Sequence, residues 1–137
     1  MELIDNKIAH SDIGVLLVED DPESAELTRS KVSEGKHSPF RVEWTDDLRT
    51  AMSRLAQPGI DVVILDFGML DSGGRTSHPP IQRVVGMKIP VVILTSDEST
   101  LSRHLTLGQG AASYLIKRQT SSVELRHALH EAVALHL

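Results

Sequence analysis

The sequence contains no cysteine and few aromatic residues, which excludes several kinds of site and limits what the core can be made of. Without cysteine, the 137-residue chain can form neither disulfides nor thiolate metal sites, and it has no cysteine nucleophile. Aromatic residues make up only 3% of the chain, so its core must consist mainly of Val, Ile, Leu and Ala. A chain this short has room for one well-packed core, so a single domain is expected.

Positive charge and long apolar runs are also in short supply. The formal net charge is −5, which argues against a general attraction to nucleic acid or to anionic membranes. No apolar run reaches the roughly 20 residues that a membrane-spanning helix needs. Residues 1–12 carry Glu2 and Asp5 where a signal peptide has positive charge, so we expect a short N-terminal extension and a cytoplasmic protein.

Short apolar runs alternate with helical patterns along the rest of the chain. The expected strands are residues 13–18, 40–44, 60–65, 90–95 and 112–116. The expected helices are residues 22–35, a helix that starts at Asp46 or Asp47 and ends near Leu55, and residues 80–85, 100–107 and 123–136. This alternation predicts an α/β fold whose parallel sheet is covered on both faces. In such sheets a ligand binds at the carboxyl ends of the strands.

Polar residues stand at the carboxyl ends of four of the expected strands. They are Glu19, Asp20 and Asp21 after the first strand, Asp66 after the third, Thr95 and Ser96 at the fourth, and Lys117 after the fifth. Each alone is more often a loop or capping residue, and Asp21 before Pro22 is expected to cap the first helix. Together they predict carboxylates, a hydroxyl and an ammonium at one edge of the sheet.

This combination of groups indicates phosphoryl chemistry. Crowded carboxylates raise one another's pKa, and a divalent cation relieves the repulsion. Hard oxygen ligands with few protein donors favour Mg²⁺, which also binds phosphate. An aspartate in the cluster can attack a phosphoryl donor and become an acyl phosphate, while an ammonium neutralises the developing charge.

Four segments resemble the signature segments of response-regulator receiver domains. They are residues 15–22, 61–66, 89–96 and 110–117, and they occur in the family's order at near-normal spacing. The resemblance covers residues 13–137, which we expect to form the receiver domain. It implies a flavodoxin-like (βα)5 fold, a doubly wound parallel five-stranded sheet with strand order 2-1-3-4-5.

The resemblance also implies a role for each site residue. Asp66 would be the phospho-acceptor and Lys117 the phosphate-binding lysine. Thr95 would be the switch hydroxyl, and Tyr114 the aromatic residue that moves inward when Thr95 engages the phosphoryl group. Mg²⁺ would be held by Glu19, Asp20 as the more direct ligand, Asp66 and the backbone carbonyl of Gly68.

A receiver domain is a signalling switch rather than an enzyme, with limited self-catalysed phosphorylation and dephosphorylation. The implied donor is a sensor histidine kinase or a histidine phosphotransfer protein that presents phosphohistidine. The implied output is a downstream effector, or a homodimer, that uses the face formed by the fourth helix, fifth strand and fifth helix. The chain shows no DNA-binding element and its net charge is negative, so we expect no direct contact with nucleic acid or membrane.

The sequence departs from the family pattern in places that keep a second hypothesis open. Residues 74–80 interrupt the third helix, which we expect to be shortened or irregular because prolines exclude a helical start before about Pro79. Arg118 stands where proline is common, so other contacts must position Lys117. A pseudo-receiver, which keeps the fold as a protein-interaction module without phosphorylation, is therefore the alternative. A haloacid-dehalogenase-like enzyme is disfavoured because Gly68 replaces its second aspartate.

Overall fold

The computed structural model describes residues 13–34, 38–66, 88–96 and 112–136. The strands are β1 (Ile13–Val18), β2 (Phe40–Thr45), β3 (Val62–Asp66), β4 (Val91–Thr95) and β5 (Ser113–Ile116). The helices are α2 (Pro22–Ser33), α3 (Leu48–Leu55) and α7 (Ser122–His136), with a short 3-10 turn, η1 (Lys117–Gln119), after β5. No helix within the described ranges is long and apolar enough to cross a membrane.

All four strand pairs are parallel, and the strand order is β2-β1-β3-β4-β5. This confirms the predicted α/β fold and its strand order. The expected third and fourth helices, the irregular segment 74–80 and Gly68 all lie outside the described residues.

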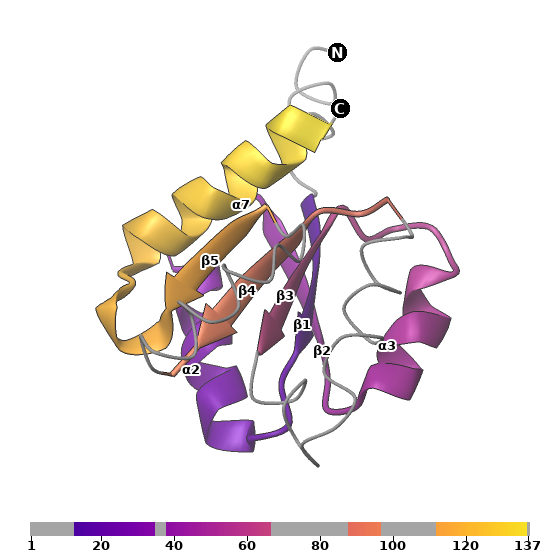
Figure 1. Cartoon of the computed structure of the whole chain (residues 1–137), viewed down its shortest axis with the longest axis horizontal. Coiled ribbons are helices and arrows are strands. Elements are labelled where there is room, and N and C mark those ends of the chain that lie inside the picture. Colours follow the sequence, from indigo (N-terminus) through magenta and orange to yellow (C-terminus); the bar gives the residue numbers. More distant parts are fainter. Residues whose placement is uncertain (1–12, 35–37, 67–87, 97–111, 137) are drawn as a thin grey trace.

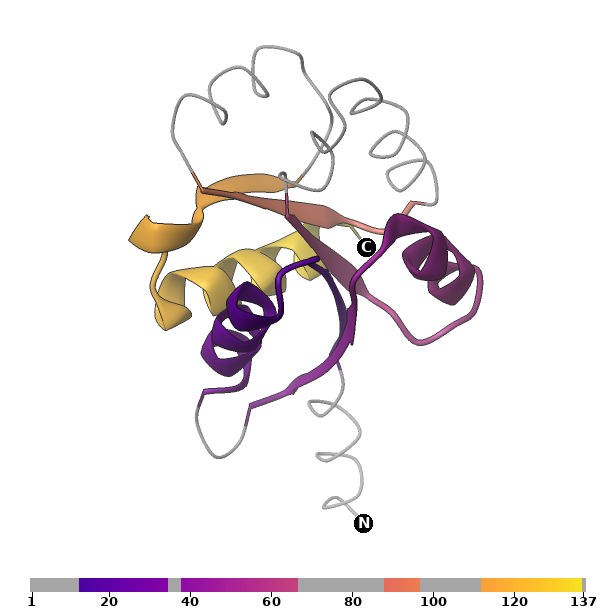
Figure 2. The ribbon, with the colours of Figure 1, turned by 90° about the horizontal axis from the view of Figure 1, so that it is seen from below.

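The sheet lies between two layers of helix (Figure 1). Figure 2 shows α2 and α7 side by side on one face and α3 on the other. Successive residues of β1 point to opposite faces, so Val15 and Leu17 pack toward α2 and α7 while Leu16 and Val18 pack toward α3. Burial on both faces explains why the central strands appear in the sequence as continuous apolar runs.

Side chains at the helix starts supply hydrogen bonds that the first turn cannot make for itself. Asp21 caps α2 by accepting from the backbone N–H of Ser24 at 2.9 Å, which confirms the expected cap. Asp47, rather than Asp46, caps α3. At α7 the Ser121 hydroxyl and the Glu124 carboxylate bond each other's backbone N–H groups, the reciprocal arrangement that fixes a helix start.

The beginning of β1 is held against the segment that leads into β3. Gly14 donates its N–H to the Asp61 carboxylate at 2.8 Å, and the Asp61 N–H donates to the Gly14 carbonyl. A Cβ on Gly14 would collide with the carbonyl oxygen of Gly59, so only glycine allows this close approach. The strand itself begins at Val62 and includes Asp66, one residue beyond the predicted end, so the Asp66 backbone is fixed within the sheet.

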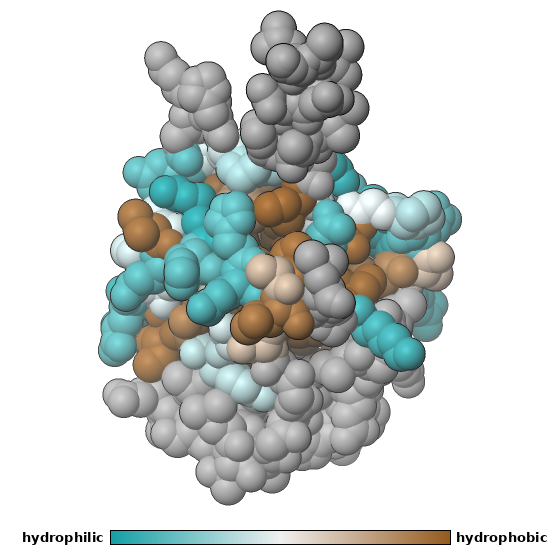
Figure 3. Space-filling view, turned by 90° about the horizontal axis from the view of Figure 1, so that it is seen from above, coloured by the Kyte–Doolittle hydropathy of each residue, from teal (hydrophilic) through white to brown (hydrophobic). Residues whose placement is uncertain are grey.

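On the face shown in Figure 3, hydrophilic side chains lie around a central group of hydrophobic ones. Among the residues that the structure describes, the exposed large hydrophobic side chains are Leu27, Trp44, Val123 and Leu135. Single exposed hydrophobic residues are ordinary on a folded protein, so they do not by themselves mark a site.

Candidate functional site

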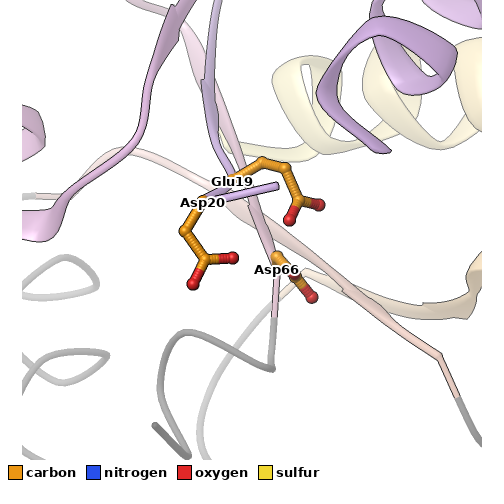
Figure 4. A group of neighbouring side chains, drawn as sticks. All are labelled: Glu19, Asp20 and Asp66. Atoms are coloured by element: carbon orange, nitrogen blue, oxygen red, sulfur yellow. The ribbon is translucent and has the colours of Figure 1, made fainter. Parts of the chain in front are cut away.

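Three carboxylates converge at the carboxyl ends of β1 and β3 (Figure 4). One oxygen each from Glu19, Asp20 and Asp66 lies within 4.8 Å of the others. Parallel pairing of Val18 with Leu65 explains this, because it brings the next residue along each strand, Glu19 and Asp66, to the same edge of the sheet. Glu19 and Asp66 are buried, with 1% and 8% of their surface exposed, whereas Asp20 faces solvent.

Lys117 supplies the ammonium of the site from the end of β5. Its Nζ lies 2.8 Å from Oε1 of Glu19 and 3.3 Å from Oδ2 of Asp66. The side chain therefore reaches past the end of β4 to the two buried carboxylates. The structure thus brings together Asp66, Lys117, Glu19 and Asp20, as the strand-end pattern predicted.

One ammonium does not compensate for this crowding of carboxylates. Burial raises the pKa of Glu19, and Asp66 raises it further, while Lys117 lowers it only in part. Burial alone would lower the pKa of the Lys117 ammonium. Its hydrogen bond with Glu19 and the charge of Asp66 outweigh that effect and raise the pKa. The site therefore retains an excess of negative charge.

The oxygen-only donor set and this excess charge fit a divalent cation such as Mg²⁺. Asp20 is the exposed member of the cluster and is open to a hydrated ion. Oε1 of Glu19, in contrast, already accepts from Lys117 at 2.8 Å and from Ser24 at 3.0 Å. Asp20 is therefore the carboxylate of the cluster with the most accessible oxygens.

The two predicted switch residues lie on one face of the sheet. Thr95 ends β4, which lies between β3 and β5, and only 2% of its surface is exposed. Asp66 ends β3, and Lys117 follows β5 directly. Tyr114 of β5 is half-buried and packs against the core cluster on the α3 side, where Ile93 also points. Since Thr95 is two residues beyond Ile93, its side chain points to the same face.

Sequence reasoning missed Ser24, which forms hydrogen bonds with both Glu19 and Lys117. Its hydroxyl donates to Glu19 Oε1 at 3.0 Å and accepts from Lys117 Nζ at 2.7 Å. The available signal was its position in the first turn of α2, three residues after the capping residue Asp21. A short polar side chain there lies next to the end of β1.

Trp44 was also missed. Its indole N–H donates to the backbone carbonyl of Glu19 at 2.8 Å, and the Glu19 N–H donates to the Thr45 carbonyl at 3.1 Å. The end of β2 thus fixes the main chain of Glu19 from the edge of the sheet. Nothing near Trp44 in the sequence predicts this contact.

The sequence matches one known protein family over most of its length. Residues 15–130 match the family described as "response regulator receiver domain". The swarming motility regulation protein RssB of Serratia marcescens is 29% identical over 105 residues, which cover 77% of this chain and 46% of RssB. This chain therefore spans less than half the length of that relative.

Solved structures of receiver domains share the fold. The receiver domain of the Francisella response regulator 1452 is 22% identical, with a TM-score of 0.72, over 92% of this chain and all (100%) of that one. The receiver domain of the sensor histidine kinase PA1611 from Pseudomonas aeruginosa is 19% identical, with a TM-score of 0.72, over 90% of this chain and 99% of that one. The latter structure has a magnesium ion coordinated in its active-site cleft.

Proposed function

Because this chain belongs to the response-regulator receiver domain family, a family of signalling switches, we propose that it is switched by phosphorylation of Asp66. Residues 13–137 would form the domain, and residues 1–12 would extend it. The family relationship supports a role in two-component signalling. We place the switch in the cytoplasm, with a sensor histidine kinase or histidine phosphotransfer protein as its donor.

The observation that carries this proposal is the position of the Asp66 carboxylate beside Lys117, 3.3 Å away, and within the acidic cluster. A carboxylate oxygen of Asp66 would attack phosphorus and form a new P–O bond. The P–N bond of the phosphohistidine would break, and the imidazole would leave with the bonding electrons. No general base is needed, since the carboxylate is already a nucleophile.

The residues around Asp66 would stabilise the charge that develops on the phosphoryl oxygens. The Lys117 ammonium neutralises part of that charge, as phosphoryl transfer requires. Mg²⁺ bound by Glu19, Asp20, Asp66 and the Gly68 carbonyl would supply further positive charge there. The buried Thr95 hydroxyl would then donate a hydrogen bond to a phosphoryl oxygen.

Movement of Thr95 toward the phosphoryl group would let Tyr114 move inward and alter the surface of β5 and α7. A downstream effector, or a second copy of the chain, would bind that face together with the expected fourth helix. A two-state element of this kind converts a local change of charge into a change of binding surface.

Intact mass measurement after incubation with Mg²⁺ and acetyl phosphate tests the proposal. We expect wild type to gain one phosphoryl group that hydroxylamine removes, and EDTA to prevent the gain. Asp66→Asn should gain none. Asp61→Asn is the matched control. Asp61 is an exposed aspartate directly before β3, at the opposite end of the strand from Asp66, and asparagine keeps an oxygen that can accept the hydrogen bond from the Gly14 N–H. Absence of any gain in wild type would favour the pseudo-receiver instead.

A further inference from the structure

Helix α2 contacts Lys117 at both its side chain and its main chain. Near the start of the helix, the Ser24 hydroxyl accepts a hydrogen bond of 2.7 Å from the Lys117 ammonium. Near its end, the Lys31 ammonium donates to the Thr120 carbonyl at 2.9 Å and to the Lys117 carbonyl at 3.4 Å. One helix therefore contacts both the tip and the base of the lysine.

The two carbonyls that Lys31 bonds lie at the first residue of η1 and just after its end. An ammonium that bonds both carbonyls ties the two ends of this turn to helix α2. The Thr120 hydroxyl adds a 2.7 Å bond back to the Ile116 carbonyl. Side chains thus fix this turn, in which Arg118 takes the place of the proline that is common in the family.

Helix α2 is itself held firmly enough to act as a support. Ala25 and Val32 are buried in the core cluster that α2 shares with α7. Arg126 of α7 donates to the Lys31 carbonyl at 3.1 Å, which joins the two helices at the residue that bonds η1. Because α2 is fixed in this way, its hydrogen bonds with Lys117 restrict the movement of that residue.

We propose that Ser24 and Lys31 are positioning residues that hold Lys117 in place for phosphoryl transfer. Lys31 fixes the turn that carries Lys117, and Ser24 fixes where its ammonium points. This inference rests on the proposed function, because it assigns the purpose of the two contacts to the chemistry at Asp66. Neither residue needs to touch the phosphoryl group.

The first test measures the rate of phosphorylation of Lys31→Met with saturating Mg²⁺ and acetyl phosphate. We expect a decrease of roughly tenfold, because misplacement of a reacting group by about 1 Å costs up to about 100-fold. Lys31→Arg should recover most of the rate, since a guanidinium can donate to both carbonyls. Arg29→Met is the control: it removes a positive charge from an exposed position of α2 and should leave the rate unchanged.

A double-mutant cycle separates positioning from a general structural effect. If Lys31 acts through Lys117, then Lys117→Ala leaves nothing for it to position. In that background, adding Lys31→Met should change the residual rate by less than about twofold. If Lys31→Met lowered the residual rate of Lys117→Ala by the same factor as it lowers the wild-type rate, the inference would be overturned. A wild-type rate for Lys31→Met alone would overturn it as well.

Ser24 is tested separately, because its contact is with the ammonium. Ser24→Ala should lower the phosphorylation rate by roughly three- to tenfold, the effect of one charge-assisted hydrogen bond partly replaced by water. Ser24→Thr keeps the hydroxyl and should restore the rate. Equal rates for Ser24→Ala and wild type would remove Ser24 from the proposal.

Amide hydrogen exchange across residues 117–120 provides a measurement that needs no phosphorylation. With neither metal nor phosphodonor present, exchange in Lys31→Met should be faster by roughly tenfold, and Arg29→Met should match wild type. Unchanged exchange in Lys31→Met would overturn the inference even if wild type is phosphorylated. If wild type accepts no phosphate, the proposed function fails, and faster exchange would still show that Lys31 holds the turn.

Discussion

The indole N–H of Trp44 donates a hydrogen bond of 2.8 Å to the backbone carbonyl of Glu19. This bond links the edge strand β2 to the residue that begins the acidic cluster. Trp44 is the single tryptophan of the chain, and 45% of its surface is exposed. Its fluorescence should therefore respond to events at the site.

Titration with Mg²⁺ should produce a saturable change in Trp44 fluorescence. A cation that draws the carboxylates together shifts the Glu19 main chain and the indole bonded to it. Asp20→Asn should weaken the apparent affinity by at least about tenfold, because it removes the most exposed carboxylate ligand. Asp46→Asn removes an exposed carboxylate outside the cluster and should bind as wild type does. Equal affinities for Asp20→Asn and Asp46→Asn would contradict the assignment.

Glu19→Gln should change how thermal stability depends on pH when EDTA is present. Because burial and then Asp66 raise the pKa of Glu19 above its ordinary value near 4.5, the folded chain holds that proton more tightly. The stability that Glu19 contributes is complete below the unfolded pKa and is lost as pH rises through the raised folded pKa. The Tm of Glu19→Gln relative to wild type should therefore increase as the pH rises above about 4.5.

Glu43→Gln is the control with the opposite sign. The hydrogen bond from Arg54 lowers the pKa of Glu43, so its contribution to stability is present above the unfolded pKa and is lost as pH falls through the folded pKa. Its Tm relative to wild type should fall slightly as pH rises, because the pair is partly exposed. Parallel pH profiles for the two variants would refute the explanation of the Glu19 pKa.

Thr95→Val should separate phosphorylation from switching. Asp66 and Lys117 remain, so the mass gain with acetyl phosphate should persist within about threefold of the wild-type rate. The sole tyrosine, Tyr114, can be replaced by fluorotyrosine, which gives one NMR signal. That signal should shift on phosphorylation of wild type and of Thr95→Ser, but not of Thr95→Val. A shift of the same size in Thr95→Val would exclude the hydroxyl as the coupling group.

Leu129→Ala should lower the free energy of unfolding by about 2–5 kcal/mol, because it opens a cavity under the sheet. Leu129 of α7 is fully buried against α2 and the strands, with 0% of its surface exposed. Leu135→Ala, on the same helix but 83% exposed, should change stability by no more than about 0.5 kcal/mol. Urea unfolding measures both, and similar values would contradict the placement of α7.

The sequence was sufficient to predict the sheet and the groups at its edge, for a physical reason. Strands buried on both faces must be continuously apolar, so their ends are visible as the points where polar residues begin. Parallel strands then bring those ends together, which is why Asp66 and Lys117 could be placed side by side from residues 51 positions apart in the printed sequence. The predicted end of β3 was wrong by one residue, because Asp66 still pairs with Leu94.

The supporting contacts were not predictable in the same way. Trp44 reaches Glu19 across 25 residues, and Lys31 reaches Lys117 across 86. Each of these bonds depends on the rotamer that a long side chain adopts once the helices are packed. The pattern of apolar residues in the sequence does not predict that rotamer. The departure at Arg118 did show that Lys117 needed other contacts, but it could not identify them.

The two core clusters lie on opposite faces of the sheet and have no member in common within the described ranges. The cluster beneath α2 and α7 includes Val32, the neighbour of Lys31, whereas the cluster beneath α3 includes Ile93 and packs against Tyr114. Under the proposed function, a core substitution beneath α2 and α7 would alter the rate of phosphorylation through Lys31, and one beneath α3 would alter the position of Tyr114. The rate of phosphorylation and the surface that a partner reads would then be adjustable separately, by apolar substitutions on opposite faces of the sheet.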